Sequence, residues 1–422
     1  MTPEELWTVK ELFVYPNEYV YWAIQIVMYP YMTGLVAGAF VLSSLYHLFG
    51  IKPLRGIARF SLVFSFALLM VAPLPLLLHL TQPARSFHVF VTPHFTSAIA
   101  AFGVVLFVYG SVVASELWFL FRKHLVNVSL YLRGKANKSF SEKIKYIVHT
   151  ILTLGAMDVG DDSLKLDAKA IRILAGAGVP IACFLHGYAG FIFGSVKANA
   201  LWMTPLMPVI FIMSAIVSGV ALCMLIYIII MEIKKIMAAR KKDAAGPSLL
   251  CEIKNEEMNT LQASKKYLIF FMIFSISLEL LDLVFRGYTA VKSWDIVRDV
   301  IYGQDFINIF LLQYTLGNLV PFILLLIPGL TIRRAIPTLL LVLFGVFMMR
   351  WNVVIGGQSF SLTFSGFMHY HMPIIPHGAE TFKEGIFGVL LILLLPFVFF
   401  WLLNKIFPVF KWVAPDQGIK IE

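Results

Sequence analysis

Nine apolar runs, each long enough to cross a membrane, dominate this sequence of 422 residues. Crossing about 30 Å of hydrocarbon as an α-helix takes roughly 20 residues. The runs are 20–48, 57–80, 94–121, 168–195, 204–233, 265–287, 306–328, 333–351 and 384–408. Only 14% of the residues are charged, against about a quarter in a soluble domain. The sequence therefore predicts an all-α polytopic membrane protein.

The sequence also contains an internal repeat. An apolar run ends in Leu-Leu-His-Leu at 77–80, and another ends in Leu-Leu-Asp-Leu at 280–283. Upstream of each tetrapeptide lies a pair of small residues four apart, and downstream lies an apolar run with one ionisable residue. The small pairs are Gly34 with Gly38 and Ala215 with Gly219, and the ionisable residues are His186 and Arg350. Such internal repeats are common in membrane proteins, and they often place a site near the repeat interface.

Two repeated four-helix bundles and one extra peripheral helix are therefore expected. The predicted parts are an outer N-terminal segment 1–19, a first bundle 20–195 with a cytoplasmic loop 122–167, a second bundle 204–351 with a cytoplasmic loop 234–264, an outer loop 352–383, and a last helix with a cytoplasmic tail 384–422. A shorter stretch at 144–157 makes the count nine to ten. Because it carries Lys145 and His149, we interpret it as a helix on the membrane surface.

Lys and Arg are distributed unevenly between the loops. With nine crossings and the N-terminus outside, 26 of the 34 basic residues fall on one side. The positive-inside rule assigns that side to the cytoplasm. The sequence thus predicts a multi-pass protein of the cytoplasmic (inner) membrane with its C-terminus inside. The net charge of +10 follows from this topology and does not indicate a nucleic-acid partner.

Ionisable residues inside a membrane are costly, so each is a functional candidate. In the predicted topology most of them lie in the outer half of the bilayer, which favours a redox or proton site near the outer face. They are His79, Glu116, His186, Glu279, Asp282, Arg286 and Arg350.

His186 is the first candidate for a catalytic group, and His79 is the second. A neutral imidazole can exchange a proton with a quinone oxygen near neutral pH. Gly187 beside His186 could leave room for a flat ring, with Tyr188 nearby. The alternative for His186 is an interhelical hydrogen bond, and for His79 it is contact with headgroups and water.

The second unit offers candidates for a proton pathway, namely Glu279, Asp282 and Arg350. Asp282 and Arg286 are four apart, which also predicts an internal ion pair. Glu279 lies deeper without a local partner, so it could relay protons. Arg350 ends its run, where it could hold a quinone oxygen or extend to the interface. Glu116 near the inner end of its run is interpreted as an interface residue.

Metal-ligating patterns are weak. The three cysteines are widely spaced and cannot form a zinc or iron–sulfur site alone. His369, His371 and His377 in the outer loop lack acidic or cysteine neighbours, so no metal site is predicted, and a loop that contacts a partner is favoured. A single haem between His79 and His186 is possible, but it is not compelling.

Four segments, in their order along the chain, resemble the NrfD/PsrC family of membrane subunits of polysulfide-reductase-type respiratory complexes. Within it the chain is most similar to the DsrP type of dissimilatory sulfur metabolism. The segments are Gly34 to Ala39, His79 to Arg85, Trp202 to Gly219, and Arg350 to Gly357.

The resemblance implies a quinone-reactive subunit, with menaquinone as the expected quinone, that binds no haem or iron–sulfur cluster itself. It implies electron exchange with a ferredoxin-like iron–sulfur subunit on the outer face, alongside a multihaem cytochrome and other membrane subunits, and possible proton translocation. On this basis His79, Arg85, His186 and Tyr188 are the expected quinone-site residues. The chain would not be redox-active alone.

A transporter or ion channel without a redox role is the alternative. It predicts discontinuous helices, which Pro73, Pro75, Pro205 and Pro208 could mark. These prolines lie in non-equivalent spans of the two units, which weakens this interpretation. The buried ionisable residues argue against a third possibility, a purely structural anchor.

Overall fold

The computed structural model of the chain describes residues 20–94, 96–97, 99–196, 199–239, 245–289, 294–361 and 366–409. The predicted outer segment 1–19 and most of the predicted cytoplasmic tail lie outside these residues. Within them, nine segments are long and apolar enough to cross a membrane, which confirms the polytopic helical fold.

Long helices account for most of the described chain. They are α2 (Ile24–His47), α3 (Arg55–Val71), α6 (Ala100–Gly134), α8 (Asp161–Gly194), α9 (Met207–Ala239), α10 (Ala245–Thr289), α13 (Ile332–Val354) and α15 (Ile386–Ile406). The shorter α-helices are α4 (Leu74–His79), α5 (His88–Val91), α7 (Phe140–Leu152), α11 (Trp294–Asp299), α12 (Val320–Leu326) and α14 (Ala379–Lys383). Single 3-10 turns form η1 (Lys52–Leu54), η2 (Pro83–Phe87) and η5 (Gly356–Gln358), and π-helix forms η3 (Val300–Gln304) and η4 (Ile307–Leu319).

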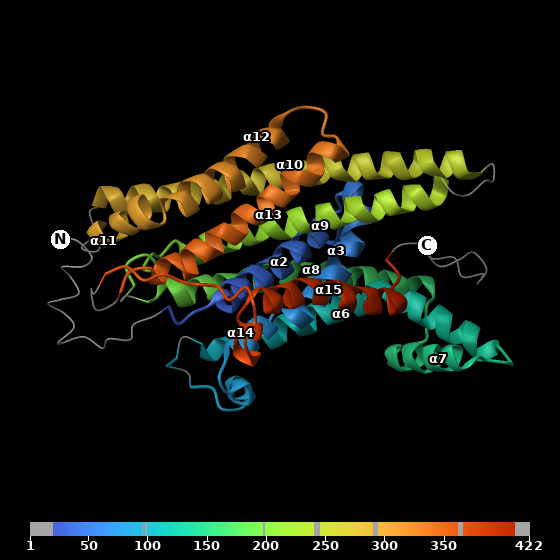
Figure 1. The fold of residues 1–422 in the computed structure, drawn as a ribbon. Coiled ribbons are helices and arrows are strands. Elements are labelled where there is room, and N and C mark those ends of the chain that lie inside the picture. Colours follow the sequence, from blue (N-terminus) through green and yellow to red (C-terminus); the bar gives the residue numbers. More distant parts are fainter. Residues whose placement is uncertain are drawn as a thin grey trace.

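The helices form two groups with the same internal contacts. In the first group α2 packs on α3 and α8, and α8 packs on α6. In the second group α9 packs on α10 and α13, and α13 packs on η4. Between the groups α2 lies along α9, α8 contacts α9, and α13 contacts α2, so the long helices run side by side (Figure 1). The predicted repeat is thus present in space, with the first helix of each unit at the centre.

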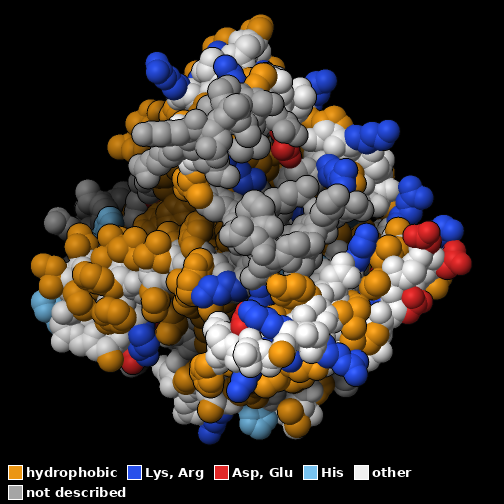
Figure 2. Space-filling model, turned by 90° about the vertical axis from the view of Figure 1, so that its right-hand side faces the viewer, with side chains coloured by type: hydrophobic (Ala, Val, Ile, Leu, Met, Phe, Trp, Pro, Cys, Tyr) orange, Lys and Arg blue, Asp and Glu red, His pale blue; other side chains and the backbone are white. Residues whose placement is uncertain are grey.

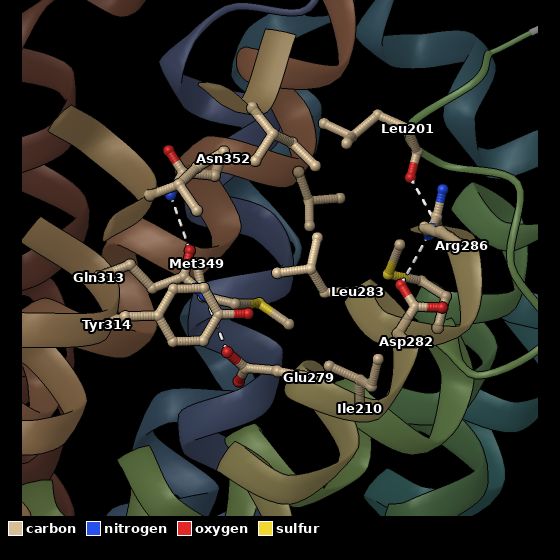
Figure 3. Close-up of a pocket in the computed structure, with 14 residues that line it drawn as sticks. Leu201, Ile210, Glu279, Asp282, Leu283, Arg286, Gln313, Tyr314, Met349 and Asn352 are labelled. Carbon is tan, nitrogen blue, oxygen red and sulfur yellow. Dashed lines mark hydrogen bonds and ion pairs between the residues drawn. The ribbon is translucent and has the colours of Figure 1, made fainter. Parts of the chain in front are cut away.

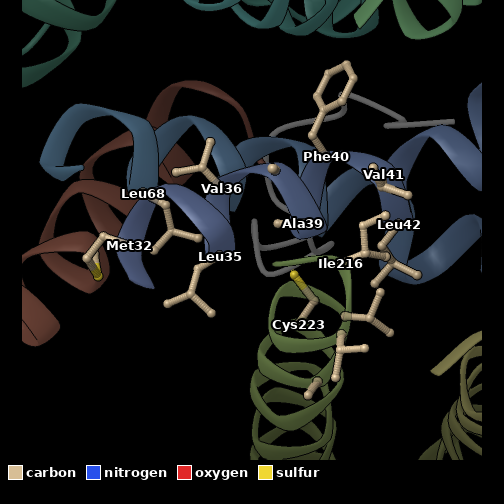
Figure 4. Close-up of a cluster of buried hydrophobic side chains, with 14 of the residues drawn as sticks. Met32, Leu35, Val36, Ala39, Phe40, Val41, Leu42, Leu68, Ile216 and Cys223 are labelled. Carbon is tan, nitrogen blue, oxygen red and sulfur yellow. The ribbon is translucent and has the colours of Figure 1, made fainter. Parts of the chain in front are cut away.

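Small residues allow α2 and α9 to approach closely. A Cβ atom on Gly38 would meet the backbone of Ala215 and Gly219, and one on Gly219 would meet the backbone of Gly38. The two small-residue pairs found in the sequence therefore pack against each other, as is usual where helices associate in lipid. Around them apolar side chains of α2, α3 and α9 form a continuous core (Figure 4).

The segment between the bundles is folded over one end of this junction. Asn199 donates from its amide to the carbonyl of Gly357, and the indole of Trp202 donates to the carbonyl of Val353. Trp202 also stacks on Trp22 with ring centroids 4.9 Å apart. These contacts join the residues just before α2, the inter-bundle segment, the end of α13 and η5.

The last span is peripheral, as predicted. In α15, Phe397 and Phe400 contact Phe64 of α3, and Phe400 also contacts Phe60. The buried residues of α15 are Gly388, Ile392 and Pro396. This helix therefore packs on the outside of the first bundle, and most of its surface faces outward.

Both predicted cytoplasmic loops are largely helical, which corrects the predicted boundaries. α6 continues to Gly134 and α8 begins at Asp161, while α9 and α10 extend over most of 234–264. Charged residues end the apolar pattern without ending a helix, because a helix that leaves the bilayer keeps its own backbone hydrogen bonds.

The stretch predicted as a surface helix at 144–157 forms α7, which is earlier by a few residues and too short to cross a membrane. Ser139 caps it with a reciprocal Ser139–Glu142 capping box, a common helix start. Instead of lying separately, α7 folds back beside α6, where Trp118 donates to the carbonyl of Leu152. Figure 2 looks onto the end of the molecule that carries α7, and Lys and Arg side chains are spread over it.

Candidate functional site

Arg350 is the largest fully buried side chain in the described part of the chain, at 0% exposure. One of its terminal nitrogens donates to Nε2 of His186 at 3.0 Å, to Oγ of Ser214 at 2.7 Å and to the carbonyl of Phe211 at 3.2 Å. The other donates to the sulfur of Met349, and the guanidinium lies 3.8 Å from the centre of the Phe211 ring. Arg350 thus joins the last helices of both units, α8 and α13, through α9.

The bond to Arg350 fixes the tautomer of His186. A guanidinium can only donate, so Nε2 of His186 must be an unprotonated acceptor. Its Nδ1 then carries the hydrogen and donates to Oγ1 of Thr33 at 3.2 Å. Thr33 can accept because its own hydroxyl donates to the carbonyl of Tyr29. A neutral His186 therefore lies between Thr33 of α2 and Arg350 of α13.

These contacts differ from the sequence-based interpretation of Arg350 and Gly187. Arg350 was placed at the end of its span, but α13 continues to Val354 and the side chain points into the helix junction instead of toward an interface. The space beside Gly187 is filled by the side chain of Ile212, so it leaves no room there for a flat ring. Tyr188 lies on another side of α8, near Phe184 and Phe191.

His79 ends α4 and pairs with Glu384, the residue that follows α14. Its Nδ1 lies 2.9 Å from a carboxylate oxygen of Glu384, and the two side chains are 18% and 31% exposed. Among the described residues nothing bonds to its Nε2. A carboxylate that holds one imidazole nitrogen leaves the other free to accept a proton. Arg85 lies six residues further on, exposed in η2.

The structure therefore does not gather the four expected quinone-site residues around one point. His186 is enclosed between helices, whereas His79 and Arg85 lie at a partly exposed end of the first bundle. Sequence reasoning missed Glu384, because it is 305 residues away from His79 and follows a loop without regular pattern. A quinone could contact a ring nitrogen of His186 only after one of its present hydrogen bonds breaks.

A cavity of about 110 Å³ lies in the second unit, between α9, α10, η4 and α13. Glu279 borders it and is not isolated, contrary to expectation. The amide of Gln313 donates to Glu279 at 2.8 Å, and the amide of Asn352 donates to Gln313 at 2.7 Å (Figure 3). Ser275, one turn earlier on α10, donates to the other carboxylate oxygen of Glu279. Three helices thus contribute to one polar chain along this wall.

The opposite wall of the cavity holds the predicted ion pair. Nε of Arg286 donates to Asp282 at 2.9 Å, and Thr204 donates to the second carboxylate oxygen. The remaining nitrogens of Arg286 donate to the carbonyls of Ala200 and Leu201. The prediction of an internal Asp282–Arg286 pair is confirmed. The pair also anchors the segment between the two bundles to α10.

Glu116 is buried among the helices. It is 0% exposed and lies 3.0 Å from Nδ1 of His47 on α2. Sequence reasoning did not single out His47, although it lies inside the predicted apolar run 20–48. The pair joins α2 to α6, and Arg122, further along α6, is paired with Asp167 of α8.

In the ranges that the structure describes, no three His, Cys, Asp or Glu side chains are grouped as metal ligands. In the predicted outer loop, His369 contacts the amide of Gln304 at 3.5 Å. Asp305 directly follows Gln304 in the chain. Burial raises the pKa of its carboxyl, and the hydrogen bond from the Asn308 amide offsets part of that rise.

The family of the chain follows from its match to a family model. Residues 15–362 match the model described as "Polysulphide reductase, NrfD". The chain belongs to the NrfD family. The matched part includes both bundles and ends in the predicted outer loop, so it covers His79, His186, Glu279 and Arg350.

Two curated relatives of this NrfD protein carry names of reductase subunits. A selenate reductase subunit of Mesobacillus selenatarsenatis is 28% identical over 80% of this chain and 74% of its own length. A putative dimethyl sulfoxide reductase membrane subunit of Halobacterium salinarum is 26% identical over 75% of this chain and 63% of its own length. The chain is thus similar to membrane subunits of oxidoreductase complexes.

Proposed function

We propose that this chain is the quinone-reactive membrane subunit of a respiratory oxidoreductase complex. The observation that carries the proposal is the partly exposed His79–Glu384 pair at one end of the first bundle, in a chain of the NrfD family. Menaquinone is the expected substrate, and dissimilatory sulfur metabolism is the expected context. The complex would lie in the cytoplasmic membrane with the His79 end outside, as the distribution of basic residues predicts.

The chemistry needs only a proton acceptor and an electron acceptor. A quinol loses two protons and two electrons when it becomes a quinone. His79 accepts a hydroxyl proton at Nε2 while Glu384 stabilises the imidazolium, and the second proton follows once the first has moved on. The two electrons pass to an iron–sulfur cluster of a partner subunit. The same groups serve quinone reduction in the reverse direction.

Arg85, Tyr188 and His186 have supporting roles in this proposal. Arg85 is close in sequence to His79 and exposed, so it can contact a quinone oxygen or a lipid phosphate. Tyr188 lies between two phenylalanines on the side of α8 away from His186 and can line the path of the ring. His186 bonds Arg350 in this structure, so its role is to hold that side chain in place. Glu279, Asp282 and Arg350 are the candidates for proton transfer.

The partners are expected from the names of the relatives, which describe subunits of reductases. We propose a ferredoxin-like iron–sulfur subunit docked on the outer face, close to His79, and a multihaem cytochrome with further membrane subunits. Mass spectrometry of the gently purified complex identifies these proteins before any activity is measured.

The test replaces His79 by Gln, which keeps an amide that can bond Glu384 but removes the proton acceptor. In the assembled complex, quinol-dependent electron transfer should fall by about 10²-fold or more. The control is His88→Gln, because His88 is exposed in the neighbouring α5 and should keep its activity within about two-fold. Full quinol activity in an assembled His79→Gln complex would refute the site. Ion flux by the reconstituted chain without quinol turnover would support the transporter alternative.

A further inference from the structure

The first unit contains a second acid–imidazole pair, at the other end of α2 from His79 and Glu384. Nδ1 of His47, the last residue of α2, lies 3.0 Å from Oε1 of Glu116 on α6. The two side chains are 4% and 0% exposed. The basic loop 50–59 follows directly, so the distribution of basic residues predicts that this end faces the cytoplasm.

This pair has two atoms that are buried without a hydrogen-bond partner among the described residues, Nε2 of His47 and Oε2 of Glu116. A lone carboxylate is costly to bury in a membrane, and an ion pair there must desolvate two charges. A neutral pair, in which the carboxyl of Glu116 donates to Nδ1 of His47, avoids both costs. Nε2 then carries the ring hydrogen. The neutral pair thus holds one proton more than a carboxylate beside a neutral imidazole.

The neighbouring helices supply no cation that could take the place of this proton within the described part of the chain. The ionisable side chains that face this part of α6 are His47 of α2, Asp167 and Cys183 of α8, His149 of α7, and Tyr109 and Arg122 of α6 itself. Arg122 is the fixed cation of this set, and it is already paired with Asp167 at 2.7 Å. A proton is therefore the charge that neutralises Glu116.

Buried polar groups continue from the pair toward the centre along one side of α2. Positions 47, 43, 40, 36 and 33 are three or four residues apart, so they share a helix face. The groups of this polar stripe are Ser43 beside His47, Tyr109 against Phe40, Ser65 on the carbonyl of Val36, and Thr33. The hydroxyl of Tyr109 is buried without a partner among the described residues. Each hydroxyl can both accept and donate a proton, and Thr33 bonds His186.

We propose that the Glu116–His47 pair is a proton-exchange site, which takes a proton from the cytoplasmic end through Nε2 of His47 and passes it to the polar stripe. When Glu116 is ionised, Nδ1 of His47 carries the ring hydrogen and Nε2 is an acceptor. A proton that binds Nε2 drives the Nδ1 hydrogen onto Glu116, which restores the neutral pair. The inference goes beyond the proposed function, because it assigns proton transfer to the inner end of the first unit and involves no quinone.

The experiment records infrared spectra of the purified complex without quinol at neutral pH, and follows the C=O stretch of protonated carboxyls after transfer into heavy water. Replacing the carboxyl proton by deuterium moves this band to lower frequency. Subtracting the spectrum of a Glu116→Gln complex isolates Glu116 from other buried acids such as Glu279. Glu380→Gln is the matched control, because the Glu380 side chain is 80% exposed.

The entry of the proton is tested by His47→Phe, which keeps a ring but removes both nitrogens. His124→Phe is the control, because His124 also lies toward the inner end of α6 but contacts His149. We expect the Glu116 band to remain in both complexes, since a buried acid without a partner stays neutral. Its shift in heavy water should be at least about ten-fold slower in His47→Phe.

Two results would overturn the inference. If Glu116→Gln removes no more of the protonated-carboxyl band than Glu380→Gln does, Glu116 is ionised and holds no proton. If the band shifts equally fast in His47→Phe and His124→Phe, the proton enters by another route. Neither result bears on the proposed function, because no quinol is present, and a failure of the His79→Gln test leaves this site unaffected.

Discussion

A single buried charge organises the centre of the molecule. Arg350 has no carboxylate within ion-pair distance among the described residues, and it is held instead by His186, Ser214, a carbonyl and an aromatic face. Neutral acceptors spread the charge without adding a second ion to desolvate, which is the costly part of a buried ion pair. His186 must stay unprotonated at Nε2 for this arrangement to persist.

His186→Phe should destabilise the chain, because it keeps a ring beside Phe211 but removes an acceptor from a buried guanidinium. The same nitrogen keeps Ser214 and the carbonyl of Phe211 as acceptors, so the loss is that of one hydrogen bond to a charged group, about 1.5–3 kcal/mol. It should appear as a lower midpoint in thermal unfolding of the purified protein. His88→Phe, on exposed α5, should change the free energy of unfolding by less than about 0.5 kcal/mol. Equal midpoints for the two variants would show that the bond to Arg350 contributes nothing.

The first turn of helix α7 contains a charged side chain, Glu142, that bonds the start of the helix. The Glu142 carboxylate accepts from the ammonium of Lys135 and from the backbone N–H of Ser139, and these bonds lower the pKa of its carboxyl below the usual value near 4.5. A lowered pKa means that the charged form stabilises the fold above pH 4.5 and that this stabilisation is lost as the pH falls through the lower pKa. The first turn of α7 should therefore open at acid pH.

Hydrogen exchange of the backbone amides at 140–144 measures this effect once intrinsic rates are divided out. Protection in the native chain should be constant from pH 7 to 5 and should decline below about 4.5. Glu142→Gln should already show the weaker protection at pH 7 and should lack the decline. A native profile that follows the variant at every pH would mean that the carboxylate does not stabilise this turn.

Span positions were predictable from the sequence because lipid demands continuous apolar helix, and all nine were found. Helix ends were not predictable, because charged helix such as 122–134 continues beyond the apolar run. Within the site, Asp282–Arg286 was predictable since both lie on one helix face. Pairs between distant segments, such as His79 with Glu384, leave no local signal. Polar neighbours of Glu279 were missed for the same reason.

At the scale of the whole molecule, the two units are joined where α2 meets α9. The joint depends on the absence of side-chain atoms, since a Cβ on Gly38 would press on the carbonyl of Ala215 and on the backbone of Gly219. Backbone cannot move aside as a flexible side chain can, so even one methyl group must push the helices apart. Overpacking of this kind costs about 1–3 kcal/mol.

Gly38→Ala should therefore lower the thermal midpoint of the protein and increase hydrogen exchange in both units. Gly110→Ala is a matched control, because its added methyl meets only a Leu69 methyl at 3.7 Å and alanine favours a helix by about 1 kcal/mol over glycine. The control should be neutral or stabilising. If both variants behave alike, close α2–α9 contact does not hold the units together. If Gly38→Ala alone increases hydrogen exchange around both His186 and Glu279, the α2–α9 contact also holds these two regions in their relative positions. The reason is that Arg350 of α13 bonds His186 of α8 across this contact.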